Sequence, residues 1–323
     1  MKFSLPVFLF ALTTLCFHQP VFAQVMEAEK VLRSGRPDTL MGWNTGGVAA
    51  LGITQTSFTN WSGGGQNSLA GNALFSVFVN YKDSFNTWDN SLDLAYGLIK
   101  QGKEGDVLKT DDKIDLLSKY GRVAFGNWYY AAMGNFKTQF APGYNYPDDT
   151  TLVSDFLSPA YILVAAGLDY KPDNTFSLFI APVTAKFTLV NNEELANRGA
   201  FGVEPAVLDS NGLVVTPGET FRSEMGGYVR AHRQRDVVEN VTVNTKLDLF
   251  SNYLENFGNI DVNWEVLLAL KVNRFLTATL STQLLYDDDV HTVIDENNNG
   301  IPEVDGPRIQ FKEVLGVGFN YKF

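Results

Sequence analysis

The sequence has few of the residues that carry redox, thiolate and imidazole chemistry. Among its 323 residues it has one cysteine and three histidines. Cys16 lies in an N-terminal apolar segment that we expect to be removed, and the mature chain then keeps only His232 and His291. A mature chain without cysteine excludes a disulfide framework, thiol catalysis and thiolate metal sites.

Basic residues are also scarce. The chain has 25 Lys and Arg against 36 Asp and Glu, a formal net charge of −11, and loss of Lys2 with the N-terminal segment makes the mature chain more negative still. Phosphate groups need basic side chains to neutralise them, so the composition predicts no nucleic-acid partner.

Long apolar runs are missing outside the N-terminus. Residues 5–17 are mostly apolar, follow Lys2 and precede the small-residue site at Ala23, so residues 1–23 are predicted to be a secretory signal peptide. A lipid anchor at Cys16 fits less well, because Leu15 stands where a small residue is needed. We expect a polar periplasmic segment at residues 24–42 and one domain at 43–323. No mature stretch reaches the roughly 18 apolar residues of a membrane helix, so a membrane-spanning chain would need a closed barrel of strands.

Alternation of apolar and polar residues is what the sequence does have. In residues 315–323, the side chains of Leu315, Val317, Phe319, Tyr321 and Phe323 share one parity. A period of two predicts a strand with one apolar face. A strand that ends on an aromatic residue resembles the closing strand of bacterial outer-membrane β-barrels, where this end is recognised by the barrel assembly machinery. The resemblance implies that machinery as a partner through Phe323.

About twelve alternating runs follow one another, and their connections alternate between short and long. Residues 126–127, 171–175 and 273–274 are short, whereas 100–113, 141–159, 191–220 and 287–307 are long. Within the long connections we expect a short helix around 152–157, a helix at 193–197 and a hairpin turn at 209–212. Short turns on one rim and long loops on the other are typical of a barrel. The predicted fold is therefore all-β: a closed antiparallel transmembrane β-barrel of about twelve strands, with ten or fourteen as alternatives, short periplasmic turns and long extracellular loops. A soluble β-sandwich is the competing fold.

Parity assigns two faces to the predicted strands, although it is mixed in residues 48–58, 114–125, 176–190 and 222–234. The residues expected to contact outer-membrane lipid include Leu92, Leu94, Val266, Leu268, Val317 and Phe319. Aromatic residues near strand ends are expected to form interfacial girdles: Trp88, Trp128, Tyr129, Tyr130, Phe140, Tyr170 and Trp264. The residues expected to face the lumen are Asp89, Asp93, Lys137, Glu224, Arg230, His232, Lys246, Asp248, Asp261, Glu265, Lys271 and Lys312. Such mixed charge fits either a filled interior or a narrow polar pore. The diameter expected for about twelve strands is compatible with both.

Several stretches resemble an uncharacterised Bacteroidota family, a domain of unknown function predicted to be associated with the outer membrane. The matching words are N-W-S-G-G-G-Q-N-S-L-A-G-N-A-L at 60–74, W-D-N-S-L-D-L-A-Y-G-L at 88–98, K-T-D-D-K-I at 109–114, T-Q-F-A-P-G-Y at 138–144 and N-I-D-V-N-W-E-V at 259–266. The resemblance extends over most of the mature chain. It implies a barrel-like envelope protein, and it carries no activity.

Residues 295–305 resemble a calcium-binding loop. The predicted ligands are Asp295, Asn297, Asn299, Ile301, Glu303 and Asp305. Oxygen ligands at positions 1, 3 and 5, Gly300 at position 6 and a carbonyl at position 7 suit Ca²⁺. Position 12 is Gly306, and two ligand positions hold Asn, so any Ca²⁺ affinity is expected to be low. The alternative is an Asn- and Gly-rich turn that binds only water.

The sequence offers only weak support for two classes of enzyme. Asp289 and His291 resemble the Asp-His pair of outer-membrane aspartyl proteases, which also need a facing acid pair; Asp111, Asp112, Asp148 and Asp149 could supply it. His232 has no serine two residues later, so the outer-membrane phospholipase pattern finds no local support.

The sequence as a whole predicts a non-enzymatic barrel that passes or binds a small solute at the cell envelope. A structural barrel with a filled lumen is the first alternative. A hydrolase that uses the Asp-His pair at the outer rim is the second.

Overall fold

The computed structural model describes residues 41–57, 66–102, 105–146, 148–173, 175–255, 257–271, 276–294, 304–319 and 321–322. The predicted signal peptide and nearly all of the predicted 24–42 segment lie outside these residues. Within them the chain is all-β except for a helix, α2 (Glu193–Asn197), and a 3-10 turn, η1 (Ala200–Gly202). In this described part, no helix combines the length and the apolar character needed to cross a bilayer.

The long strands of the described chain form one antiparallel sheet of 13 strands. In chain order they are β1 (Gly42–Thr56), β2 (Ser68–Lys82), β3 (Asn86–Gln101), β4 (Val107–Phe125), β5 (Trp128–Thr138), β8 (Ala160–Asp173), β9 (Phe176–Leu189), β12 (Phe221–Val238), β13 (Val241–Asn252), β14 (Asp261–Lys271), β15 (Leu276–Tyr286), β18 (Gln310–Phe319) and β19 (Tyr321–Lys322). The order in the sheet is β18-β15-β14-β13-β12-β9-β8-β5-β4-β3-β2-β1-β19. Neighbours in space are thus neighbours in sequence, apart from the connections that carry small hairpins.

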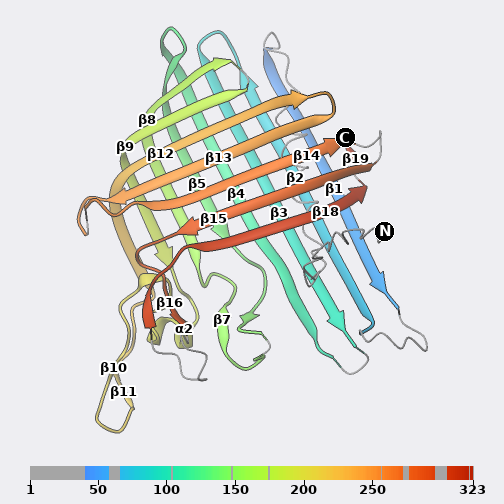
Figure 1. Ribbon diagram of the computed structural model, residues 1–323. Coiled ribbons are helices and arrows are strands. Elements are labelled where there is room, and N and C mark those ends of the chain that lie inside the picture. Colours follow the sequence, from blue (N-terminus) through green and yellow to red (C-terminus); the bar gives the residue numbers. More distant parts are fainter. Residues whose placement is uncertain are drawn as a thin grey trace, which may run out of the picture.

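The two ends of the sheet belong to neighbouring parts of the chain. β18 pairs with β15, whereas β19 pairs with β1 through Val48↔Lys322 and Ala49↔Tyr321. Only Asn320 separates β18 from β19 in the sequence. Figure 1 shows the sheet curled on itself, with β12 to β15 in front of β2 to β5.

The connections differ between the two ends of the sheet. One end has tight turns, such as Gly126-Asn127 between β4 and β5 and Glu239-Asn240 between β12 and β13. The other end holds the long connections and their small elements: β6 (Gly143–Tyr144), β7 (Leu152–Ser154), α2, η1, β10 (Val207–Leu208), β11 (Val214–Thr216), β16 (His291–Ile294) and β17 (Val304–Pro307). The predicted alternation of short and long connections is found in the described strands, except that the connection between β3 and β4 is short. We call these the short-turn end and the long-loop end.

Two local predictions were wrong. Residues 100–113, expected as a loop, belong largely to strands, because β4 begins at Val107 and pairs with β3 up to Lys100. Residues 152–157, expected to be helical, contain β7 followed by a turn. The helix expected at 193–197 and the hairpin turn at 209–212 are confirmed.

The long-loop end has an apolar core of its own. Leu152, Val190, Leu195, Ala196 and Val203 are buried together, and they come from the β5–β8 and β9–β12 connections. This core joins two long connections into one packed unit.

Caps and cross-links fix α2 on that core. The side-chain oxygen of Asn192 accepts the backbone N–H groups of Glu194 and Leu195, which makes Asn192 the N-cap of α2. The amide nitrogen of Asn192 donates to Asp155 Oδ2 at 3.0 Å. The helix of one connection is therefore held against the other connection.

A bulge interrupts β9 at Pro182. The register shifts on both sides of β9, opposite Gly167 of β8 and near Gly227 of β12. Proline has no N–H group to donate to the ladder, which favours a bulge at this point. A Cβ atom on Gly167 would lie 2.0 Å from the carbonyl oxygen of Ile180, so the bulged backbone leaves room for glycine alone.

We expect Gly167→Ala to destabilise the sheet by about 1 to 3 kcal/mol, because the added methyl group meets backbone atoms that cannot move independently. Gly134→Ala is the matched control, since a Cβ atom there meets nothing within 4 Å. The measurement is the temperature at which purified protein loses its β-sheet circular dichroism. Equal melting temperatures for the two variants would contradict the close approach of β8 and β9.

Candidate functional site: the charged interior of the sheet

The inner face of the curled sheet carries many charged and polar side chains, and its outer face exposes large apolar side chains. The inner face also holds an apolar cluster, made up of Ala131, Met133, Ala165, Phe179, Ala181, Tyr228 and Phe250. On β3, Thr87 and Asp93 are only 7% and 8% exposed, whereas Trp88 and Leu98 on the other face are 42% and 36% exposed. A soluble protein places its large apolar side chains inside. This sheet has an inverted polarity, because it buries charged side chains and exposes large apolar ones.

The residues expected to face the lumen can now be located. Asp93, Glu224 and Lys246 are buried, and the other seven with described side chains are partly buried. Lys271 in β14 and Lys312 in β18 are placed by their backbones alone.

A cluster of two lysines and two aspartates lies toward the short-turn end. Lys119 Nζ of β4 is 2.6 Å from Asp169 Oδ2 of β8. Lys171 Nζ of β8 lies 3.0 Å from Asp89 Oδ2 of β3 and 3.3 Å from Asp169 Oδ2. Ser177 of β9 donates its hydroxyl hydrogen to the other oxygen of Asp169. This short-turn cluster joins β3, β4, β8 and β9 across the inner face.

A second group of ion pairs lies on β4 and β5. Asp115 Oδ2 is 3.5 Å from Lys113 Nζ and 3.9 Å from Lys137 Nζ. Asn135 donates its amide hydrogen to Asp115 Oδ1 at 2.7 Å. Lys137, expected in the lumen, is thus in contact with an acid that parity analysis did not single out.

β12 and β13 carry the third group. Arg230 Nε lies 3.6 Å from Asp248 Oδ1, and the Tyr228 hydroxyl donates to the same oxygen at 2.7 Å. His232 Nε2 lies 2.9 Å from Asn244 Oδ1. Arg230, His232 and Asp248 therefore share the face that parity predicted for them.

Glu265 of β14 lies within electrostatic range of bases on several strands. It interacts electrostatically with Lys246 of the adjacent β13, and also with Lys113, Lys137 and Arg230. β14 and β4 are far apart in the strand order, so the interaction between Glu265 and Lys113 crosses the interior rather than following the sheet. The curled shape and the charge pairing depend on each other.

Lys186 anchors the charges at the long-loop end. Its Nζ atom is 3.4 Å from Glu224 Oε2, 3.0 Å from Asp261 Oδ2 and 3.7 Å from Asp287 Oδ2. Glu224 is buried, and burying a carboxylate is costly unless it is paired. Lys186 therefore neutralises acids from β12, β14 and the β15–β18 connection at once.

Arg222 links three of the long connections. Its guanidinium donates to the Gly202 carbonyl oxygen at 3.1 Å and lies 3.2 Å from Glu255 Oε2 and 2.8 Å from Asp289 Oδ2. Glu224 also approaches it, at 3.7 Å. A guanidinium presents five N–H donors in a fixed plane, which suits one side chain to several acceptors.

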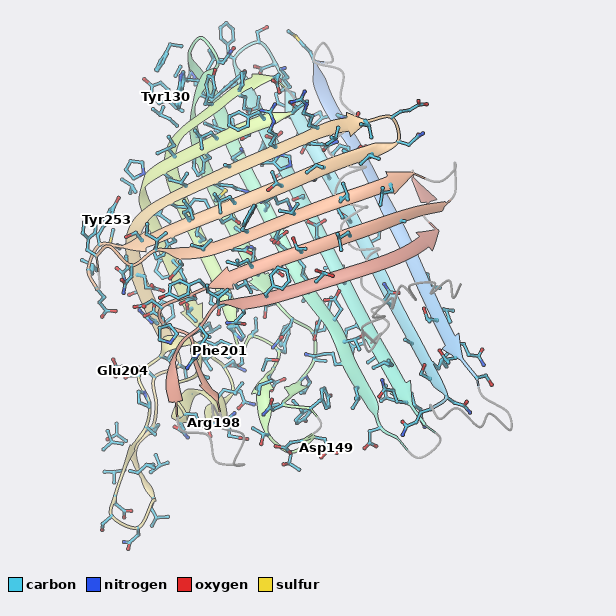
Figure 2. The ribbon with its side chains drawn as sticks, viewed as in Figure 1. Tyr130, Asp149, Arg198, Phe201, Glu204 and Tyr253 are labelled. Atoms are coloured by element: carbon cyan, nitrogen blue, oxygen red, sulfur yellow. The ribbon has the colours of Figure 1, made fainter. Side chains whose placement is uncertain are left out.

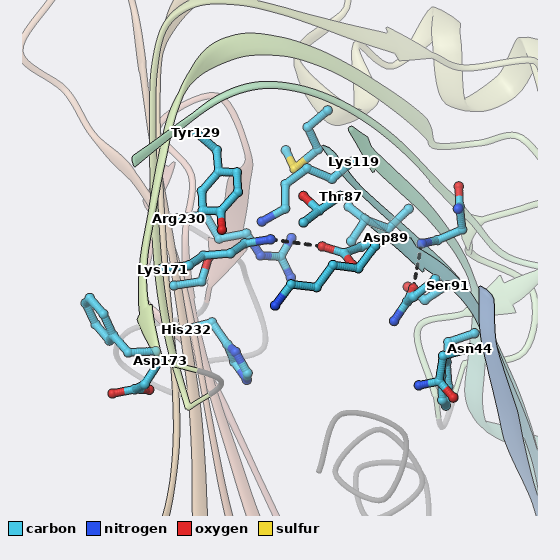
Figure 3. A pocket seen from close by; sticks show the side chains of 18 of the residues that line it. Asn44, Thr87, Asp89, Ser91, Lys119, Tyr129, Lys171, Asp173, Arg230 and His232 are labelled. Atoms are coloured by element: carbon cyan, nitrogen blue, oxygen red, sulfur yellow. Dashed lines mark hydrogen bonds and ion pairs between the residues drawn. The ribbon is translucent and has the colours of Figure 1, made fainter. Parts of the chain in front are cut away.

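A cavity of about 450 Å³ opens into the interior beside the short-turn cluster. Its wall includes Asp89, Lys119, Lys171, Arg230 and His232, and Tyr129 also lines it. Figure 3 shows Lys171 reaching toward Asp89, with Tyr129 and Arg230 beside the pair. Tyr129 was expected in an interfacial girdle; its place in this cavity corrects that prediction, since successive residues of a strand point to opposite faces.

The sequence interpretation missed several of the charged interior residues. Lys119 and Lys186 lie in runs whose parity was mixed, and Lys113 and Lys171 were assigned to connections. The bulge at Pro182 explains Lys186, because it shifts the inward parity of β9 from odd to even residues. Proline inside an alternating run was the available signal.

The Asp-His pair considered for hydrolysis is not arranged around a free carboxylate. Asp289 pairs with Arg222 at 2.8 Å. His291 begins β16, and its side chain lies outside the described residues. The acid of this pair serves to fix a connection.

Two of the acids considered as partners for the Asp-His pair instead accept hydrogen bonds from residues of nearby turns. Asp112 accepts the N–H groups of Phe140 and Ala141 at 2.7 and 2.9 Å. Asp148 accepts hydrogen bonds from the hydroxyl and N–H groups of Thr150, and these bonds lower the pKa of its carboxyl group. Both carboxylates hold turns in place.

The predicted calcium loop lies mostly outside the described residues. Only Asp305 of its predicted ligands falls within them, in β17, and its side chain is not placed. Ile294 pairs with Val304, so β16 and β17 bring the two ends of residues 295–303 together. In the described part of the chain, no group of three or more acidic or histidine side chains has the arrangement of a metal site. Calcium binding stays a prediction.

Comparison with known proteins gives a family of unknown function and distant structural similarities. A protein family of unknown function (DUF3078) matches residues 53–144. This range contains four of the five sequence words that suggested such a family, whereas the word at 259–266 lies outside it. No curated protein matches the sequence.

Three solved structures overlap with most of the chain at low similarity. The outer membrane channel from Pseudomonas putida F1 is 11% identical and has a TM-score of 0.36, with 89% of this chain and 99% of that chain covered. The translocator domain of the autotransporter NalP from Neisseria meningitidis has 10% identity, a TM-score of 0.35 and coverage of 93% and 98%. The β domain of the Bordetella autotransporter BrkA has 11% identity, a TM-score of 0.32 and coverage of 86% and 99%. TM-scores this low do not establish a common fold.

We expect Arg222→Gln to loosen the long-loop end, because the change removes the shared partner of Glu255 and Asp289 and leaves the buried Glu224 with fewer donors. The local cost should be about 1 to 3 kcal/mol. The measurement is the rate of limited proteolysis within the long connections, which should rise about tenfold.

Two further variants complete that experiment. Arg222→Lys keeps the charge without the planar fork and should fall between the wild type and Arg222→Gln. Arg235→Gln makes the same charge change at an exposed position of the same strand and should leave the proteolysis rate unchanged. Equal rates for Arg222→Gln and Arg235→Gln would show that Arg222 does not hold the connections.

Proposed function

We propose that the protein is an outer-membrane β-barrel whose charged interior passes or binds a small polar solute. The observation that carries this proposal is the inverted polarity of the sheet, with ion pairs inside and large apolar side chains outside. An apolar outer surface around a polar interior is the arrangement that a barrel in lipid requires. The expected signal peptide is consistent with export to the envelope.

Closure through the C-terminal segment completes the proposed barrel. If β18 and β19 are one strand interrupted at Asn320, that strand pairs with β15 on one side and β1 on the other, and the barrel has the twelve strands predicted from the sequence. Lipid offers no hydrogen-bond partners to an open sheet edge, so closure is also what the membrane demands. The barrel assembly machinery and outer-membrane lipid are the partners that belong to this proposal.

Exposed aromatic side chains near strand ends support a membrane position. Trp43 lies near Tyr81 and Trp88, with ring centroids 5.2 and 6.0 Å apart. Tyr130 is exposed at the short-turn end, where Figure 2 shows it, and Trp128 packs on Tyr170 at 4.9 Å. Amphipathic rings suit the boundary between headgroups and hydrocarbon. In the proposed orientation the short-turn end is periplasmic and the long-loop end is extracellular.

The interior offers a place for a solute. The 450 Å³ cavity presents an ammonium and a carboxylate, Lys171 and Asp89, that both keep some exposure. Pockets of about 300 to 1,000 Å³ with a few convergent polar groups are typical of small-molecule sites. We assign the solute to this cavity.

The structural alternative, a barrel with a filled lumen, is favoured by a different observation. Ion pairs join strands that are not neighbours in the sheet, such as β8 with β3 and β9 with β14, and Arg222 draws the long connections together at one end. Such a network would stiffen a closed barrel whether or not anything passes. Conductance distinguishes the two.

The membrane position predicts a dependence on depth along β14. Val266→Arg, near the middle of the strand, should cost about 2 to 4 kcal/mol, because the guanidinium would lie at the bilayer midplane. Leu270→Arg, on the same face next to the strand end, should cost about 0 to 1 kcal/mol. Reversible denaturant unfolding in lipid vesicles measures both. Equal costs would contradict a bilayer around this face.

The solute proposal predicts opposite effects of two neutralisations in the cavity. In planar bilayers under a salt gradient, Lys171→Gln should shift the selectivity of the purified protein toward cations, and Asp89→Asn should shift it toward anions. Each change in the permeability ratio should be on the order of fivefold, since a unit charge acting at ~4 Å in water is worth about 1 kcal/mol.

The matched control for this experiment neutralises an exposed pair. Glu194 and Arg198 of the long-loop end lie 3.7 Å apart and are largely exposed, so the double change to Gln should leave selectivity unaltered. A protein that never conducts, and whose cavity binds no small molecule, would contradict the solute proposal and support the barrel with a filled lumen. Identical selectivity in all variants would show that the conduction path does not pass through this cavity.

A further inference from the structure

A small hairpin projects from the long-loop end. β10 and β11 pair only with each other in the described part of the chain, and Figure 1 shows them extending beyond the rest of the molecule. The turn between them is well defined. Asp209 accepts the N–H groups of Asn211 and Leu213, each at 2.8 Å, and Gly212 adopts the positive φ that this turn needs.

The base of the hairpin is fixed to the packed connections. Ala206 donates its N–H to the Asn197 carbonyl oxygen at 2.9 Å, and Gly218 donates to the Asn197 side chain at 2.8 Å. Glu219 donates its N–H to the Glu204 carbonyl oxygen at 2.9 Å. Figure 2 places Glu204 at this base. The hairpin is therefore a presented element, held by α2 and the apolar core beneath it.

The hairpin presents aliphatic side chains to solvent. Its five large aliphatic residues are between 48% and 66% exposed: Val207, Leu208, Leu213, Val214 and Val215. Single exposed apolar residues are ordinary, whereas several gathered on one projecting element indicate an interaction surface. These five lie within nine residues of sequence on one element, far from the strands that we assign to lipid.

The shape of the hairpin indicates recognition by side chains. β10 has two residues and β11 has three, and a register shift at Val215 interrupts their pairing. Short, bulged edges are poor templates for an added strand. A partner would therefore receive the aliphatic side chains in a groove of its own.

The charge of this segment indicates which kind of partner can bind the hairpin. Residues 199–221 include Glu204, Asp209 and Glu219 and no lysine or arginine. Two copies of the hairpin would bring like charges together. Hydrogen bonds from the Leu213 and Asn211 backbones lower the pKa of Asp209, so the turn carries a charge at neutral pH, which opposes insertion into a bilayer.

We propose that the β10–β11 hairpin is a docking element that inserts its five aliphatic side chains into an apolar groove with a basic rim on another protein. The groove buries the aliphatic residues, and lysine or arginine on its rim faces Glu204 and Glu219. Attraction between opposite charges at the rim sets the orientation of the partner and speeds its association.

Site-specific photo-crosslinking in cells that make the full chain tests this. A benzophenone amino acid at Val215 should give one dominant adduct with a different protein. The same probe at Leu254, an exposed leucine of the β13–β14 connection at the same end, should not give it. An adduct with a second copy, an adduct with lipid, or no adduct on correctly folded protein would overturn the proposal.

The chemistry of the groove is tested on the captured protein after purification. Its affinity for the intact barrel should fall at least tenfold with Leu213→Ser plus Val214→Ser. It should fall at least threefold with Glu204→Lys plus Glu219→Lys, and the loss should shrink at high salt. Unchanged affinity in the first variant overturns aliphatic docking, and unchanged affinity in the second overturns the basic rim. The folded fraction of each variant, measured by gel mobility before and after heating, separates loss of binding from loss of folding.

Discussion

Pairing of charges inside the curled sheet is the constraint on which the rest of the structure depends. A buried charge without a partner costs several kcal/mol, so the inner face can be this polar only if acids and bases from different strands meet. Asp169 meets two lysines, and Lys186 meets three acids. The sheet must therefore curl with a definite radius and register, because another curvature would separate these partners.

Much of this fold could be predicted from the sequence, and the reason is periodicity. Alternation along residues 88–98 and 262–270 predicted the strands β3 and β14, and turn chemistry located the 126–127 turn and the 209–212 hairpin. Both signals are local, so one sequence suffices to detect them. The loop expected at 100–113 was wrong because polar residues such as Asp111 and Asp112 occur on strands when the inner face of the sheet is itself polar.

The candidate site was harder to predict from the sequence than the fold. Parity placed Asp89, Arg230 and Asp248 on the inner face, yet it could not say which charges meet. The partner of Asp89 is Lys171, 82 residues away and on the far side of β4 and β5, and no local pattern encodes that contact. Lys186 was hidden by a single bulge. The cavity exists because of the distances between walls, which depend on the curvature of the whole sheet.

The pairing of β1 with β19 has a consequence for the order of folding. β19 follows every other strand of the described chain, so its pairing with β1 joins the two segments that are farthest apart in that sequence. Contacts between such distant segments carry the largest loop-closure entropy and form slowly. During that interval β1 presents an open edge to any other extended chain. Until β19 pairs with it, the β1 edge is therefore a place where another extended chain could add to the sheet.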